Sequence, residues 1–181
     1  DPDAQRSYID TVFVGFSILS ICVSAVAMYA SPAILAVLFP NFLESGYMDD
    51  VVLLTRIILL QPILLGFSNI FAAVIQLKRR FALYALSPIL YNSGIIVGAL
   101  VLYPTQGLPG LAWGVVLGAL LHAVILVPSV FQDGFLSSFS FVQWTELFET
   151  ARTSIPRSLA LAMNQLTFLG LTVIAGTLSV G

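Results

Sequence analysis

Five apolar stretches, each long enough to cross a bilayer, dominate the pattern along the chain. A membrane-spanning helix needs about 20 mostly apolar residues. The five stretches cover residues 7–30, 50–77, 81–103, 110–130 and 155–181, with prolines, glycines and charged residues between them. Strands of a membrane β-barrel would instead be segments of about ten residues that alternate between polar and apolar positions. The pattern therefore predicts an all-α integral membrane protein, a polytopic bundle with five transmembrane helices.

Residues 135–154 follow an amphipathic helical pattern and are not uniformly apolar. One side of this predicted helix is apolar and the other is polar. The apolar side carries Phe141, Trp144, Leu147, Phe148 and Ala151, and the polar side carries Gln143, Glu146, Glu149 and Thr150. Two interpretations stay open. The segment is either a helix lying in the cytoplasmic membrane interface, with Trp144 at headgroup depth, or a cytoplasmic helix packed on the protein.

Prolines mark the predicted ends of several spans. Pro32 and Pro40 fall in a predicted loop over residues 31–49, and Pro156 falls in the predicted first turn of the fifth span. Proline is tolerated in a first turn because its missing N–H would have no helical partner there. Pro62 and Pro88 lie inside spans, where we expect them to kink the helices.

Composition supports a lipid environment and excludes several classes of site. Charged residues make up only 9% of the chain, against roughly 25% in soluble domains. The mean hydropathy is +1.00 and the net charge is −2, so no nucleic-acid partner is expected. Cys22 and His122 are the sole members of their residue types. We therefore expect no disulfide, no metal site and no cofactor.

The distribution of basic residues predicts which side of the membrane each connection occupies. Of the seven Lys and Arg residues, all but Arg56 lie on the side that contains the Lys78–Arg80 turn. The loops on the other side, residues 31–49 and 103–109, contain no Lys or Arg. Positive residues are enriched in cytoplasmic loops. The Lys78–Arg80 turn is therefore predicted to be cytoplasmic.

Glycines recur four residues apart in two spans. Gly94 and Gly98 lie in the third span, and Gly110, Gly114 and Gly118 lie in the fourth. Small residues let membrane helices approach closely. We interpret these stripes as packing seams within the bundle, with a dimerisation face as the alternative.

His122 extends the glycine stripe of the fourth span by one turn. We expect its imidazole to form a hydrogen bond across a helix pair, and the alternative is a proton relay. The hydrogen-bond interpretation is favoured because no carboxylate is expected deep within the spans to pass protons on. Asp and Glu fall in the predicted loops or near the predicted span ends.

Arg56 is the one basic residue well inside a span. It could grip an anionic headgroup with its guanidinium, or it could snorkel toward the interface and pair with Asp49 or Asp50. The second interpretation is favoured because Arg56 shares its helix face with Leu60 and Phe67. Three further weak candidates for substrate binding lie in the fifth span, namely Arg157, Asn164 and Gln165.

No set of reactive groups in the sequence suggests catalysis. There is no Ser/His/Asp set, no glycine-rich phosphate loop and no cluster of metal ligands, so the protein is not expected to be an enzyme. The chain starts without Met and ends within an apolar run. We therefore expect it to be a piece of a longer membrane protein.

Several segments resemble lipid II flippases of the MurJ (MviN) family. They are RFALYALSPILYN with GIIVGAL, GLPGLAWGVVLGALLHAVILVPSV, PRSLALAMNQLTFLGLTVIAGTLSVG, and AILAVLFPNF with LLTRIILLQPIL. The resemblance covers nearly all of the chain from about Tyr8. It implies that the five spans correspond to the third to seventh helices of a 14-helix transporter with two lobes. Residues 1–134 would then belong to the first lobe, and residues 155–181 would start the helix that links the lobes.

The resemblance also implies an activity and a location. The activity is the movement of lipid II, a lipid-linked peptidoglycan precursor, from the inner to the outer leaflet by alternating access. The location is the bacterial inner membrane, and the expected functional form is a monomer. The family's cavity arginines lie on helices that have no counterpart in this sequence. Another exporter of the same superfamily and a membrane scaffold without transport activity are the alternatives.

Overall fold

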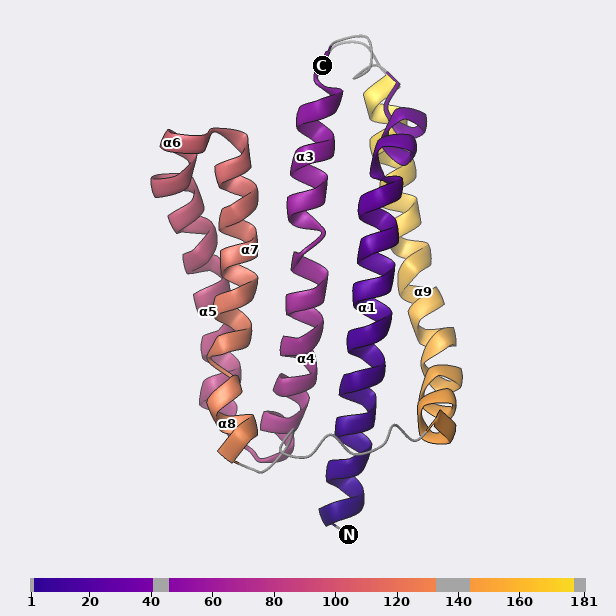
Figure 1. Cartoon of the computed structure of the whole chain (residues 1–181), viewed down its shortest axis with the longest axis vertical. Coiled ribbons are helices and arrows are strands. Elements are labelled where there is room, and N and C mark those ends of the chain that lie inside the picture. Colours follow the sequence, from indigo (N-terminus) through magenta and orange to yellow (C-terminus); the bar gives the residue numbers. More distant parts are fainter. Residues whose placement is uncertain (1, 41–45, 133–143, 178–181) are drawn as a thin grey trace.

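The computed structural model describes residues 2–40, 46–132 and 144–177, and no strand occurs within these ranges. Long helices lie side by side and form an elongated bundle (Figure 1). The α-helices are α1 (Pro2–Leu38), α3 (Met48–Ile58), α4 (Gln61–Leu77), α5 (Phe81–Val97), α6 (Tyr103–Gln106), α7 (Leu108–Val124), α8 (Val127–Gln132) and α9 (Trp144–Thr177). A short π-helix, η1 (Gly98–Leu102), joins α5 to α6. The predicted all-α class is confirmed.

Within the described ranges, five segments are long and apolar enough to cross a membrane, as the sequence predicts. They are Arg6–Leu38, Met48–Leu77, Phe81–Gln106, Leu108–Gln132 and Leu147–Ala175. Many of their large apolar side chains are exposed on the surface of the bundle. Lipid is the solvent that suits such a surface, because it requires no polar groups there.

The first span is longer than predicted, because α1 continues through Pro32 to Leu38. The prediction that residues 31–38 belong to a loop is therefore wrong. Proline removes one helical hydrogen bond, the one that its N–H would donate to residue 28. Other donors reach the carbonyl of Met28 in this structure. The helix therefore does not have to end at the proline.

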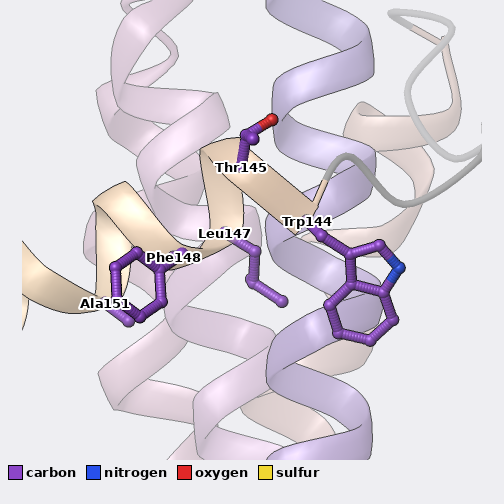
Figure 2. A pocket seen from close by; sticks show the side chains of 5 residues that line it. All are labelled: Trp144, Thr145, Leu147, Phe148 and Ala151. Carbon is purple, nitrogen blue, oxygen red and sulfur yellow. The ribbon is translucent and has the colours of Figure 1, made fainter.

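The last helix begins well before its predicted start at residue 155. α9 runs without interruption from Trp144 through Pro156, so Pro156 lies inside the helix and not in its first turn. Figure 2 shows the first turns of α9 running across the direction of the neighbouring helices, whereas Figure 1 shows its later turns running alongside α1. Residues 135–143 of the predicted amphipathic helix lie outside the described residues.

One small core cluster lies between α1, α4 and α8. Phe71 and Ile75 of α4 pack against Leu126 and Val130, and Phe13 of α1 covers them. The ring centroids of Phe13 and Phe71 lie 5.6 Å apart in a stacked arrangement. This aromatic contact fixes α1 against α4, the two helices that later form one side of the candidate site.

The turn between α4 and α5 contains a residue in the left-handed region. Arg79 has a φ of 56°, and its N–H donates to the carbonyl of Gln76 at 3.0 Å. The next N–H, from Arg80, donates to the carbonyl of Ile75 at 3.1 Å. This pair of bonds forms a Schellman motif, in which glycine usually occupies the position that Arg79 holds here.

Candidate functional site

The glycine stripes of the third and fourth spans face each other between α5 and α7. A Cβ atom at Gly98 would overlap the Cα atom of Gly114, and one at Gly94 would overlap the Cα atom of Gly118. A Cβ atom at Gly110 would overlap the backbone of Leu102 in η1. The two helices therefore touch backbone to backbone, and the stripes lie inside this chain's own bundle.

His122 lies at the centre of a polar network that joins three helices. Its Nδ1 contacts the hydroxyl of Ser68 on α4, and that hydroxyl also donates to the carbonyl oxygen of His122 at 3.2 Å. The ring of Tyr91 on α5 meets the imidazole edge to face, with centroids 6.4 Å apart. Gln61 of α4 donates to the hydroxyl of Tyr91 at 2.8 Å. The network links α4, α5 and α7 at membrane depth.

Arg56 contacts a neighbouring helix and does not pair with an acidic residue of its own helix. Its Nε atom donates to the carbonyl oxygen of Met28 on α1 at 3.2 Å. Within the described part of the chain, neither Asp49 nor Asp50 forms an ion pair with it. The side chain of Arg56 remains exposed.

A groove between α1, α4 and α9 brings Arg157 together with polar residues from three separate segments. Its volume is about 730 Å³. The lining consists of Tyr8, Ile9, Val12, Phe16, Gly66, Asn69, Ile70, Ala73, Val74, Leu77, Ser154 and Arg157. We call this feature the α1–α4–α9 groove. Most of its wall is apolar, and among the described lining residues Arg157 is the one that carries a formal charge.

The residues that sequence reasoning selected do not all meet in this groove. Arg157 lines it, whereas Arg56 lies on α3, and Asn164 and Gln165 are exposed on α9 beyond it. Sequence reasoning missed Tyr8, Asn69 and Ser154 as members of one site. The polarity of Asn69 within a span was the one available signal, because Tyr8 and Ser154 reach the groove only through the packing of α9 on α1.

The first turns of α9 dock on α1. Leu147 lies directly over Gly15, where a Cβ atom would overlap the leucine side chain. The hydroxyls of Tyr8 and Thr150 form a hydrogen bond of 3.0 Å. Figure 2 shows Trp144, Leu147 and Phe148 on one side of these turns and Thr145 on the other. These residues, with Ala151, line an apolar hollow of about 590 Å³.

Comparison with known proteins identifies the family of the chain. The family model described as lipid II flippase MurJ matches residues 1–181, and no match is found among curated proteins. This result agrees with the all-helical bundle and its five candidate membrane spans. The chain belongs to the MurJ family of lipid II flippases.

Proposed function

We propose that this chain takes part in moving lipid II from the inner to the outer leaflet of the bacterial inner membrane by alternating access. The observation that carries the proposal is the α1–α4–α9 groove, which combines one guanidinium with a largely apolar wall built from three candidate membrane spans. The family match over residues 1–181 supports lipid II as the class of substrate.

The substrate sets a physical problem that such a groove addresses. A pyrophosphate headgroup must cross a hydrocarbon core of about 30 Å. An unshielded charge at the bilayer centre is costly, by several kcal/mol or more. A groove that is open on one side shields the headgroup while the lipid tail stays in the bilayer. The groove is not an enclosed cavity, which fits this arrangement.

Arg157 is the residue proposed to hold the headgroup. Guanidinium groups bind phosphate oxygens through two parallel N–H bonds, a geometry that lysine does not provide. Asn69, Ser154 and Tyr8 surround the same space and supply neutral hydrogen-bonding groups. Asn164 follows Arg157 by seven residues, so it lies on the same face of α9 two turns further along. Together with Gln165, it would extend a polar path for the headgroup.

Genetic rescue tests the proposal. The gene at its natural length would be expressed in cells depleted of their own lipid II flippase, and growth and outer-leaflet lipid II would be measured. We expect rescue by the unchanged protein, loss of rescue with Arg157→Ala, and retained rescue with Arg152→Ala. Arg152 is the matched control, because it is an exposed arginine of the same helix that does not line the groove.

Two other results would contradict parts of the proposal. Absence of rescue by the unchanged protein, with normal levels in the membrane, would favour a different lipid-linked substrate or a scaffold without transport activity. Rescue that survives Arg157→Ala would leave the flippase assignment in place and remove Arg157 from the substrate path.

A further inference from the structure

The proline in α1 leaves one backbone carbonyl without its helical donor. In an α-helix, the carbonyl of residue 28 accepts from the N–H of residue 32. Residue 32 is a proline and has no N–H, yet α1 continues through it. An unpaired carbonyl is costly in a membrane, where no water can replace its donor, so another donor is needed in place of the missing one.

Two side chains supply the replacement. The hydroxyl of Ser31 donates to the carbonyl oxygen of Met28 at 2.8 Å. The Nε atom of Arg56 donates to the same oxygen at 3.2 Å from the facing helix α3. The contact uses one of the five N–H donors of the guanidinium and fixes the direction in which the others point.

The remaining donors of Arg56 have no acidic partner among the residues that the structure describes. The nearest carboxylates on α3, Asp49 and Asp50, lie in its first turn and form no ion pair with Arg56. The guanidinium is exposed on the outside of the bundle. Charged side chains in membrane spans pair with opposite charges or with backbone carbonyls, and the carbonyl of Met28 leaves the positive charge of Arg56 uncompensated.

The position of Arg56 along the span places lipid phosphates within reach. The segment Met48–Leu77 has 30 residues, which at 1.5 Å per residue is about 45 Å of helix for a hydrocarbon core of about 30 Å. Arg56 lies eight residues from the start of this span, or about 12 Å along its axis. With the excess length shared between both ends, Arg56 lies only about 5 Å below the headgroup region.

We propose that Arg56 is a binding site for a lipid phosphate group, held in position by the carbonyl of Met28. The site belongs to the leaflet opposite the Lys78–Arg80 turn and is separate from the α1–α4–α9 groove. The phosphate comes either from a membrane phospholipid or from the pyrophosphate of a lipid-linked substrate. The guanidinium fork offers both the same two-point contact.

Native mass spectrometry of the natural-length protein tests this site. The probes are phosphatidylglycerol, lipid II, and diacylglycerol, which has the same tails as phosphatidylglycerol but no phosphate. We expect Arg56→Gln to weaken binding of one or both phosphate-bearing probes roughly tenfold, because it removes a charged hydrogen bond. Binding of diacylglycerol should not change. A loss confined to phosphatidylglycerol or to lipid II identifies the source of the phosphate.

A second variant separates phosphate binding from a purely structural role. Pro32→Ala restores the N–H donor for Met28, so the helix no longer depends on Arg56. If the site binds phosphate, the double variant Pro32→Ala with Arg56→Gln binds phosphate lipids as weakly as Arg56→Gln alone. Recovery of binding in the double variant would overturn the proposal, and so would unchanged binding in Arg56→Gln.

Discussion

Ser68 and His122 hold α4 and α7 together through two contacts made by a single hydroxyl. The hydroxyl of Ser68 contacts Nδ1 of His122 and donates to the carbonyl oxygen of the same residue at 3.2 Å. A hydroxyl has one hydrogen, so both contacts are satisfied together when Nδ1 carries its proton and donates to the serine oxygen. The pair thereby selects one tautomer of the imidazole.

Ser68→Ala should lower the free energy of unfolding by about 1 kcal/mol, a magnitude typical of hydrogen bonds between membrane helices. Thermal unfolding of the natural-length protein in detergent would measure it. Ser93→Ala is the control, because Ser93 is only partly buried and its hydroxyl donates within its own helix, to the carbonyl oxygen of Ile89 at 2.9 Å. The effect of Ser68→Ala should shrink when His122 is already replaced by Phe. Simple additivity of the two changes would show that the pair is not coupled.

Gly98→Ala should destabilise the bundle, because the new methyl group would overlap the backbone of Gly114. Overpacking a tight contact costs about 1–3 kcal/mol. Gly170→Ala is the matched control, since nothing lies within 4 Å of a Cβ atom there. Alanine also suits a helix better than glycine by about 0.5–1 kcal/mol, so the control should be neutral or stabilising. Equal thermal stability of the two variants would contradict backbone contact between η1 and α7.

The protein should be more stable with glycine at position 79 than with alanine there. Its φ of 56° lies in the left-handed region, which costs a residue with a side chain about 1–2 kcal/mol. Arg79→Gly and Arg79→Ala remove the same charge and differ mainly in this conformational cost. We expect the glycine variant to unfold at the higher temperature. The opposite order would show that the turn does not adopt the Schellman geometry.

The number of spans could be predicted because each one needs a long apolar run that little else in a sequence imitates. The ends of the spans were harder to predict. Pro32 and Pro156 indicated boundaries, yet both lie inside helices. At Pro32 the missing hydrogen bond is replaced by Ser31 of the same helix and by Arg56 of another helix, which lies 28 positions from Met28. Contacts between residues so far apart cannot be predicted from the residues next to the proline in the sequence.

The candidate site was predictable only in part, for the same reason. A guanidinium such as Arg157 in a span indicates function, because its presence in lipid is costly. Its companions Tyr8 and Ser154 lie at opposite ends of the chain and meet only when α9 packs on α1. Leu147 lies over Gly15, and this contact brings α9 close to α1. The presence of a leucine and a glycine in the sequence does not predict that they meet.

Cysteine labelling should place the Lys78–Arg80 turn in the cytoplasm, because the basic residues gather on that side. Cys22 is the one cysteine of the sequence and would first be replaced by serine. In intact cells, a membrane-impermeant maleimide should miss Arg79→Cys and label Thr105→Cys, which lies in α6 on the opposite side. Permeabilised cells serve as the control, since both sites should then react. Labelling of Arg79→Cys in intact cells would show that the topology is the reverse of the predicted one.

The first turns of α9 should lie in the membrane interface. Trp144 and Phe148 are 72% and 73% exposed, and they share the apolar side of turns that run across the bundle (Figure 2). Tryptophan at such a position prefers headgroup depth. Trp113→Phe would leave Trp144 as the single tryptophan, because the sequence has two. Its fluorescence should be quenched more strongly by lipids brominated near the headgroup than by lipids brominated near the tail end. If neither brominated lipid quenches its fluorescence, Trp144 faces water or protein. The first turns of α9 would then be a cytoplasmic element packed on α1.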